Sequence, residues 1–241
     1  MHKLEGTAFL VPEPMLEVAL EESAGASLTW DIQVEELRIL IALYGENGTE
    51  AADAFGKVRK KFGFFHIREG RLDAGKQLFL ALRKTGKTFT CAESLTGGYV
   101  SKLLTDIPGS SDVFWGGFVT YSNGAKIRLL KVRPELINTH GAVSREVVIA
   151  MAEGALQQSE ADIALSISGL SGPGGGSLEK PVGTVWMAVM TRDQNLYVKN
   201  FFFQGSRDRV RKSVAASGML ITEALLLHRE WLDSMKIWQY S

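Results

Sequence analysis

Three short segments combine nucleophilic, charged and flexible residues in patterns that could do chemistry. The first is TCAESLTGG, in which an apolar, strand-like run ends at Ser94 and continues into Thr96, Gly97 and Gly98. Consecutive glycines let a ligand approach the backbone closely, and the first N–H groups of a helix attract a phosphate or a developing oxyanion. Ser94 is therefore a candidate nucleophile. The alternative interpretation is that Ser94 and Thr96 only cap the helix that follows.

The second segment is TYSNGAK, from Thr120 to Lys126. Tyr121 and Ser122 close a predicted strand, Asn123 is a suitable helix cap, and Lys126 falls in the first turn of the predicted helix. The positive end of a helix dipole disfavours a charged lysine, and this placement would lower the pKa of the amine, as a general base requires. The alternative is an exposed, solvated lysine.

The third segment is the glycine- and proline-rich loop SGPGGGSLEKPVG, in which Gly174, Gly175 and Gly176 offer bare backbone amides to an anion. It is not a P-loop, and Ser177 stands where a dinucleotide-binding fingerprint needs glycine or alanine. A flexible surface connection is the alternative. All three segments follow predicted strands, and ligands of α/β folds gather beyond the carboxyl ends of strands. The pattern indicates a site for a phosphorylated small molecule, with serine–lysine hydrolysis as one possible chemistry.

The composition narrows the functional class. Of the 241 residues, 27 are basic and 27 acidic, which argues against binding to nucleic acid or to a membrane surface. No apolar run approaches the roughly 18 residues of a membrane span, and the first residues lack a secretion signal. We therefore expect a cytoplasmic protein with a small-molecule partner.

The cysteine and histidine content excludes several kinds of site. The single cysteine, Cys91, excludes an intrachain disulfide and a cysteine-built zinc site, and we expect it to pack as a small hydrophobe. The four histidines are scattered without metal-ligand spacing. We expect neither a metal nor any other cofactor.

Strand and helix patterns alternate from about residue 88. The predicted strands span residues 87–93, 113–122, 162–169, 184–191 and 196–205, and the predicted helices span 99–107, 123–132, 144–159 and 206–232. We predict that residues 71–241 form a three-layer α/β/α sandwich around a mixed, mostly parallel sheet. The helix at 71–86 leads into it, with Gly86 as its stop signal and Ser144 as the cap of a later helix.

The N-terminal residues 1–70 have a different pattern from the rest of the chain. They predict a small α+β module with one or two strands at 29–45, a helix at 49–63 and a short strand at 64–70.

The C-terminal helix and the aromatic tail WLDSMKIWQYS predict a subunit interface. We expect a homo-oligomer, most simply a dimer.

Five longer motifs carry a resemblance to a known family: AESLTGG, LTDIPGSSDVFWGGFVTYSNGAK, GAVSREVVIAMAEGA, ISGLSGPGGGSLEKPVGTVWMA and GSRDRVR. In order and spacing they resemble the CinA C-terminal domain family over about residues 72–227, in particular its PncC-type nicotinamide-nucleotide amidases. The resemblance implies hydrolysis of nicotinamide mononucleotide to nicotinate mononucleotide and ammonia, within pyridine-nucleotide recycling.

The resemblance also implies roles for individual residues. Ser94 matches the nucleophile, and Tyr121 and Lys126 match its catalytic partners, with neutral Lys126 taking the serine proton and later giving it to ammonia. Amides around Thr96, Gly97 and Gly98 would hold the oxyanion. The remaining candidates for binding the substrate and its phosphate are Ser110, Ser111, Ser168, Gly174, Gly175, Gly176 and Arg207. Arg211 matches a further family arginine, with a solvated helix face or a subunit contact as the alternative.

Four positions depart from the family pattern: Leu95, Gly124, Ser168 and Ser206 stand where cysteine, glutamate, threonine and aspartate are usual. None of these changes removes a proposed catalytic group. They leave two alternatives open, a catalytically weak or inactive nucleotide-binding protein and hydrolysis of another amide-bearing nucleotide. Fused family members carry a molybdopterin-binding-like domain upstream, for which this chain has no room, so we expect no pyrophosphatase activity. Residues 35–70 faintly resemble the small module that precedes the amidase in those fusions.

Overall fold

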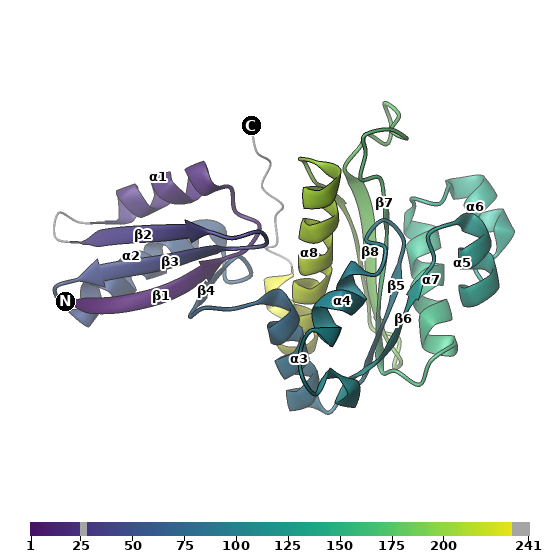
Figure 1. Cartoon of the computed structure of the whole chain (residues 1–241), viewed down its shortest axis with the longest axis horizontal. Helices are drawn as coiled ribbons and strands as arrows, with labels where there is room; N and C mark the ends of the chain where they lie inside the picture. Colours follow the sequence, from purple (N-terminus) through teal and green to yellow (C-terminus); the bar gives the residue numbers. More distant parts are fainter. Residues whose placement is uncertain (25–27, 233–241) are drawn as a thin grey trace. The chain divides into compact units, whose positions relative to one another are not determined.

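The computed structural model describes residues 1–24 and 28–232, and the chain divides into two compact units (Figure 1). One unit contains Met1–Asp73 and the segment that begins at His228, and the other contains Ala74–Leu227. The predicted division after residue 70 into two domains stays a prediction. So does the interface expected of the C-terminal tail, because residues 233–241 lie outside the described residues.

The first unit is an antiparallel sheet in the order β2-β3-β1-β4, packed against two helices. Its elements follow the chain as β1 (His2–Ala8), α1 (Glu13–Ser23), β2 (Thr29–Val34), β3 (Ile39–Gly45), α2 (Gly48–Phe62) and β4 (Ile67–Glu69). This is the βαββαβ arrangement of ferredoxin-like folds. The sequence patterns predict β2, β3, α2 and β4 but miss β1 and α1. The first residues of β1 are polar and exposed, so its alternation is weak.

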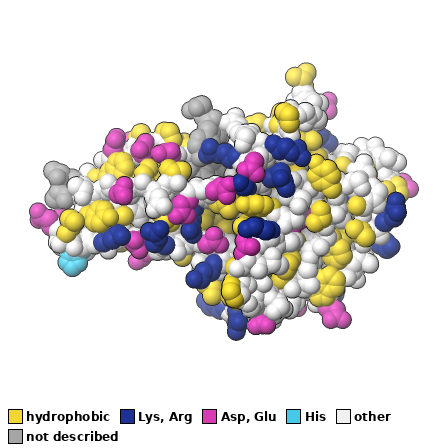
Figure 2. Space-filling view, in the orientation of Figure 1, with side chains coloured by type: hydrophobic (Ala, Val, Ile, Leu, Met, Phe, Trp, Pro, Cys, Tyr) yellow, Lys and Arg dark blue, Asp and Glu magenta, His cyan; other side chains and the backbone are white. Residues whose placement is uncertain are grey.

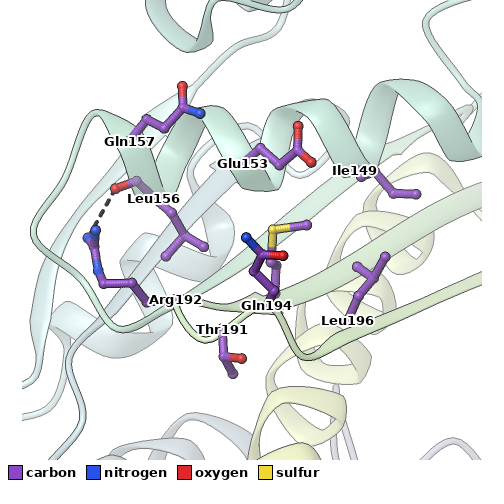
Figure 3. A pocket seen from close by; sticks show the side chains of 9 residues that line it. Ile149, Glu153, Leu156, Gln157, Thr191, Arg192, Gln194 and Leu196 are labelled. Atoms are coloured by element: carbon purple, nitrogen blue, oxygen red, sulfur yellow. Dashed lines mark hydrogen bonds between the residues drawn. The ribbon is translucent and has the colours of Figure 1, made fainter.

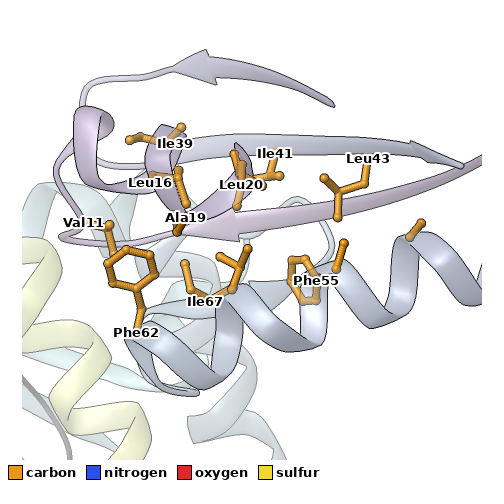
Figure 4. Close-up of a cluster of buried hydrophobic side chains, with 14 of the residues drawn as sticks. Val11, Leu16, Ala19, Leu20, Ile39, Ile41, Leu43, Phe55, Phe62 and Ile67 are labelled. Carbon is orange, nitrogen blue, oxygen red and sulfur yellow. The ribbon is translucent and has the colours of Figure 1, made fainter. Parts of the chain in front are cut away.

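The core of the first unit lies between the sheet and its helices (Figure 4). Ile39, Ile41 and Leu43 point to the same face because side chains alternate along a strand. Leu20 of α1 and Phe55 of α2 pack in the same buried cluster. Gly6 of β1 faces Phe55. A side chain at position 6 would overlap the phenyl ring, which explains why glycine stands there.

The second unit contains a five-stranded sheet in the order β6-β5-β7-β8-β9. Its strands are β5 (Phe89–Glu93), β6 (Phe114–Val119), β7 (Ile163–Gly169), β8 (Thr184–Thr191) and β9 (Leu196–Phe202). Strands β6 and β7 pair in parallel with β5, whereas β8 is antiparallel to both β7 and β9. Among these described strands only β8 runs against the others, so the predicted mixed, mostly parallel sheet is confirmed.

Helices cover both faces of this sheet (Figure 1). One layer holds α3 (Ala74–Thr85), α4 (Tyr99–Thr105) and α8 (Arg207–Leu227), and the other holds α5 (Asn123–Leu130), α6 (Pro134–His140) and α7 (Arg145–Gln157). The second unit also contains a short 3-10 turn, η1 (Ser110–Asp112), whereas the 3-10 turn η2 (Arg229–Trp231) belongs to the C-terminal segment of the first unit. The predicted three-layer α/β/α sandwich is confirmed. Helix α6 is too short to give a periodic pattern, and the sequence does not predict it.

The helix ends follow the predicted chemistry with one correction. Helix α3 stops before Gly86, whose φ of +63° suits glycine, and Ser144 caps α7 by accepting a hydrogen bond from Val147 N at 3.4 Å. The cap of α5 is Ser122, which accepts from Ala125 N at 3.1 Å, and not Asn123, which is already helical. Ser122 has the extended backbone that a cap residue needs.

Helix α5, which contains Lys126, is held against α7 by close backbone packing. A Cβ atom at Gly154 of α7 would overlap the backbone carbonyl of Leu130 at the end of α5, so glycine permits this approach. Leu130 also joins a buried cluster with Met151 of α7 and Ala92 of β5. The position of Lys126 therefore depends on packing that involves residues far apart in the sequence.

The surface is mixed in charge. Figure 2 shows Lys and Arg side chains interspersed with Asp and Glu side chains over the visible face, in keeping with the equal numbers of acids and bases. In the part of the chain that the structure describes, no helix is both long and apolar enough to cross a membrane.

Candidate active site

The site is assembled at the carboxyl ends of the three parallel strands. Ser94 directly follows β5, and its N–H donates to the carbonyl of Ile167 in β7 at 3.1 Å. The N–H of Thr120, which follows β6, donates to the carbonyl of Glu93 at 2.7 Å. These ladder bonds place the ends of β5, β6 and β7 side by side, as expected for ligand sites of α/β folds.

Lys126 lies in direct contact with Ser94. Its Nζ donates to Ser94 Oγ at 3.0 Å and to the backbone carbonyl of Thr120 at 2.8 Å. Only 1% of the Lys126 surface and 7% of the Ser94 surface are exposed. The alternative interpretation of Lys126 as a solvated lysine is therefore wrong. The structure joins the first two sequence motifs in one serine–lysine pair.

Burial lowers the pKa of Lys126 from its ordinary value of 10.5 to about 8. Desolvation is the cause, because removing the amine from water disfavours its charged form. No carboxylate forms an ion pair with Lys126 among the described residues, so nothing offsets this effect. The place of Lys126 in its helix predicts the direction of this pKa shift, but burial and not the helix dipole causes it. A neutral Lys126 amine has the lone pair needed to accept the Ser94 proton.

Glu93 organises the turn that follows Ser94. Its fully buried carboxyl group accepts hydrogen bonds from the backbone N–H groups of Gly98 (3.0 Å), Val100 (3.1 Å) and Ser101 (2.9 Å), and from Ser101 Oγ (2.7 Å). Glu93 thereby satisfies the free N–H groups at the start of α4. The alternative role of Ser94 and Thr96 as helix caps is wrong. The sequence patterns do not predict that Glu93 accepts these hydrogen bonds, although an acidic residue immediately before the candidate nucleophile is a signal that can be seen in the sequence.

The backbone amides around Ser94 fall into two groups. Gly97 N–H donates to the carbonyl of Ser94 at 3.2 Å and Gly98 N–H donates to Glu93, so both are engaged. The N–H groups of Leu95 and Thr96 donate to no acceptor within the described residues. Gly97 and Gly98 have φ values of +60° and +93°, a conformation that favours glycine. The turn thus leaves two adjacent amides free directly after Ser94.

Arg207 connects Tyr121 with the glycine-rich loop. Its Nη2 donates to Tyr121 Oη at 2.9 Å, and its Nη1 donates to the carbonyl of Gly172 at 2.6 Å. Tyr121 is 61% exposed and makes no hydrogen bond to Ser94 or Lys126. The three glycines at 174–176 lie farther along this loop, which follows β7. The structure therefore brings the third motif to the same end of the sheet as the first two.

The remaining candidate serines separate into two places. Ser168 is buried near the end of β7, and its Oγ donates to the carbonyl of Ala142 at 2.7 Å. Ser110 and Ser111 lie in η1, just before β6, where the carbonyl of Val113 accepts from the N–H of Phe89 at the start of β5. This is the amino end of the parallel strands. Within one chain the structure does not bring Ser110 and Ser111 to Ser94.

The other positions singled out in the sequence have ordinary surroundings. A side chain at exposed Gly124 would have space, since its Cβ would meet only Ser122 Oγ, at 3.9 Å. Ser206 accepts from Arg209 N at 3.3 Å at the start of α8. Cys91 is fully buried, burial raises the pKa of its thiol, and its Sγ lies 3.4 Å from Ser101 Oγ. Among the described residues, no cluster of His, Cys, Asp and Glu could hold a metal ion.

A separate cavity of about 440 Å³ lies between the end of α7 and the β8–β9 turn (Figure 3). It is lined by Ile149, Glu153, Leu156, Gln157, Met190, Thr191, Arg192, Gln194 and Leu196. Thr191 pairs with Ile163 at the start of β7, so the cavity lies at the opposite end of the sheet from Ser94. The guanidinium of Arg192 is engaged by backbone carbonyls, including that of Leu156 at 3.1 Å. The cavity contains none of the predicted site residues.

Comparison with known proteins gives a consistent family assignment. The family model of the CinA C-terminal domain matches residues 73–226. The nicotinamide-nucleotide amidohydrolase PncC of Escherichia coli (strain K12) is 51% identical over 145 residues, which cover 60% of this chain and 88% of that protein. A CinA-like protein of Geobacter sp. (strain M21) is 40% identical over 228 residues, 95% of this chain and 55% of the relative. The chain thus spans about half the length of that CinA-like relative.

Solved structures agree with the fold. The competence/damage inducible protein CihA from Agrobacterium tumefaciens superimposes with a TM-score of 0.61 at 38% identity, covering 63% of this chain and 93% of that one. The competence damage-inducible protein A from Klebsiella pneumoniae gives a TM-score of 0.62 at 34% identity, covering 64% and 96%. Both matches have sizes close to that of the second unit.

Proposed function

Because this chain belongs to the CinA C-terminal domain family, we propose that it hydrolyses the carboxamide of nicotinamide mononucleotide to give nicotinate mononucleotide and ammonia. One observation carries the chemistry: a buried lysine amine lies 3.0 Å from the hydroxyl oxygen of Ser94. The substrate is suggested by the name of the E. coli relative, which shares 51% identity over 145 residues.

In the proposed reaction, Ser94 Oγ attacks the carboxamide carbon while the neutral Lys126 amine takes the hydroxyl proton. The tetrahedral intermediate expels its nitrogen as the C–N bond breaks, and Lys126 returns the proton so that ammonia leaves. Water then attacks the resulting ester and gives one proton to Lys126. The ester bond breaks, Lys126 returns this proton to Ser94 Oγ, and the acid product loses its own proton to solvent to leave as the carboxylate. The carbonyl of Thr120, 2.8 Å from Lys126 Nζ, holds the amine toward Ser94 throughout.

The negative oxygen of the tetrahedral intermediate needs hydrogen-bond donors close to Ser94. We assign this role to the N–H groups of Leu95 and Thr96, because the amides of Gly97 and Gly98 already have acceptors. One such donor typically contributes ~3 kcal/mol to lowering the barrier. The departure at Leu95 does not affect this contribution, because a backbone N–H is independent of the side chain.

The phosphate of the substrate would bind between Arg207 and the glycine-rich loop. The guanidinium of Arg207 already joins the carbonyl of Gly172 to Tyr121 Oη, and arginine is well suited to bidentate phosphate contacts. Backbone amides at Gly174, Gly175 and Gly176 would add donors. We place the exposed Tyr121 ring against the bound substrate, and Ser168 near the end of β7 beside it.

The substrate assignment is tested by ammonia release from nicotinamide mononucleotide, measured beside nicotinamide riboside, free nicotinamide and a panel of other amide-bearing nucleotides. We expect turnover of the mononucleotide with kcat/KM at least ~10-fold above that of the riboside, because the riboside lacks the phosphate. Tight binding without ammonia would instead indicate the nucleotide-binding alternative. Faster ammonia release from another amide-bearing nucleotide would change the substrate assignment.

The pH dependence of the reaction follows from Lys126. Its pKa of about 8 means that the amine is protonated, and unable to act as a base, in more acidic solution. We therefore expect kcat/KM to rise with pH and to level off above about pH 8. The measurement is a pH–rate profile with wild-type protein in buffers of constant ionic strength. A profile that stays flat across this pKa, from about pH 6 to about pH 9, would contradict neutral Lys126 as the base.

A further inference from the structure

Arg211, in the second turn of α8, forms a fork-like contact with the backbone of the Ser94 turn. Its Nε donates to the carbonyl of Leu95 at 3.0 Å, and its Nη2 donates to the carbonyl of Thr96 at 2.8 Å. Two donors on one edge of a planar guanidinium thus bind two consecutive carbonyls, a geometry that a lysine ammonium does not reproduce. Both contacts lie within the second unit.

This contact fixes the orientation of two peptide groups. A trans peptide is planar, so its N–H points away from its own carbonyl. When Arg211 holds the carbonyl of Leu95, the N–H of Thr96 in the same peptide is turned away from the arginine. The same holds for the carbonyl of Thr96 and the N–H of Gly97, which then donates to the carbonyl of Ser94 at 3.2 Å.

Glycine at position 97 suits the close approach of the arginine to the turn. A Cβ atom at Gly97 would lie 3.1 Å from Arg211 Nη2, closer than a carbon normally approaches, and the φ of +60° there also favours glycine. Thr96 Oγ1 is buried beside this contact and has no hydrogen-bond partner among the described residues. Arg211 thus engages the carbonyls of the turn, while the N–H groups of Leu95 and Thr96 next to Ser94 have no acceptor among the described residues.

We propose that Arg211 is a positioning residue that preorganises the oxyanion-binding amides of this turn. It fixes the N–H of Thr96 directly, through the carbonyl of Leu95. It fixes the N–H of Leu95 indirectly, because the Gly97 N–H that it orients donates to the carbonyl of Ser94, which lies in the same peptide group as the Leu95 N–H. The inference rests on the proposed serine chemistry but not on the identity of the substrate. Arg211 does not contact the reacting atoms, and its Nε and Nη2 are engaged by the protein itself. Its role therefore differs from the solvated helix face and from the subunit contact considered for it in the sequence.

The test compares Arg211→Met and Arg211→Lys with wild type, and uses Arg209→Met, two residues earlier on the same helix, as the matched control. Two reactions are measured. The first is ammonia release from nicotinamide mononucleotide, resolved into kcat and KM. The second is covalent labelling of Ser94 by an alkyl fluorophosphonate, in which the Ser94 oxygen forms a P–O bond, fluoride leaves and Lys126 takes the serine proton. The labelling needs no nucleotide and is followed by mass spectrometry.

We expect Arg211→Met to lower kcat by about 100-fold with KM within about threefold of wild type, because the lost interaction acts mainly in the transition state. The labelling rate should fall to a similar extent, since the phosphoryl oxygen occupies the same amides. Arg211→Lys should recover only part of the loss, and millimolar guanidinium ion should partly restore Arg211→Met. Arg209→Met should behave as wild type.

Unchanged kcat and labelling in Arg211→Met would overturn the proposal, and so would a loss confined to KM. If Arg211→Met unfolds, the comparison rests on folded Arg211→Lys, for which a wild-type labelling rate is the contrary result. A wild type that is labelled but releases no ammonia would remove the substrate assignment and leave the Arg211 comparison intact. A wild type that shows neither reaction would overturn both proposals.

Discussion

Ser94→Ala and Lys126→Met are each expected to lower ammonia release from nicotinamide mononucleotide by at least ~100-fold. The alanine variant removes the proposed nucleophile. The methionine variant keeps an unbranched side chain in the buried space but removes the amine that lies 3.0 Å from Ser94 Oγ. Because we propose that the two residues act in one proton-transfer unit, the double variant should be little worse than Ser94→Ala alone. The measurement is steady-state turnover with each purified variant.

Matched control variants show whether the loss of turnover is specific to Ser94 and Lys126 or follows from replacing any serine or lysine. Lys84 is an exposed lysine in the last turn of α3, and Lys84→Met should leave turnover unchanged. Ser213, a partly exposed residue of α8, provides the matched serine control as Ser213→Ala, because alanine suits a helix. Both active-site variants should still bind nicotinamide mononucleotide in calorimetry, because the proposed phosphate contacts remain. Turnover that survives Ser94→Ala would refute the serine mechanism.

Glu93→Ala is expected to lower the free energy of unfolding by about 3–5 kcal/mol, since it leaves several buried donors without an acceptor. The Glu93 carboxyl group accepts three backbone N–H groups and the Ser101 hydroxyl, all at 2.7–3.1 Å. Glu93→Gln should cost less but still about 2 kcal/mol, because its NH₂ group cannot accept from these donors. Such losses are a large share of the stability of a typical domain.

Urea unfolding followed by circular dichroism measures this effect, with Glu153→Ala as the control. Glu153 is exposed on α7, so its replacement should change the unfolding free energy by less than about 0.5 kcal/mol. Glu93→Ala should also lose more activity than its lower stability explains, because the turn after Ser94 loses the hydrogen bonds that Glu93 accepts from it. An unfolding free energy within about 1 kcal/mol of wild type would contradict this account of Glu93.

The sequence predicts those parts of the molecule that local patterns specify. The three-layer sandwich follows from alternating strand and helix patterns. The placement of Ser94 and Lys126 at one edge of the sheet follows from the rule that loops beyond parallel strands share one edge, whereas their pairing is what the family resemblance implies. Local sequence does not predict the burial of Lys126, because the helix that carries it is held against α7 by contacts between distant residues, such as that of Leu130 with Gly154. The strand β1 escaped prediction because its first half is exposed and polar.

Other features of the site depend on contacts between distant residues, which a single sequence does not encode visibly. Arg211 meets the carbonyls of Leu95 and Thr96 across more than a hundred residues of chain, and its role emerges only when α8 is placed beside the Ser94 turn. Glu93 precedes the proposed nucleophile in the sequence, and in the structure it is the acceptor for N–H groups at the start of α4. Ser110 and Ser111 lie close to the site in sequence order but at the other end of the strands.

The surroundings of Cys91 have a consequence for the oxidative environments in which the protein can work. Its thiol is fully buried, and its raised pKa keeps it protonated, so it presents neither access nor a thiolate to peroxide or to alkylating reagents. The proposed nucleophile is an oxygen, which such reagents do not attack. The proposed hydrolysis would therefore not depend on a reactive cysteine, and oxidation of thiols should affect it less than an amidase built on one.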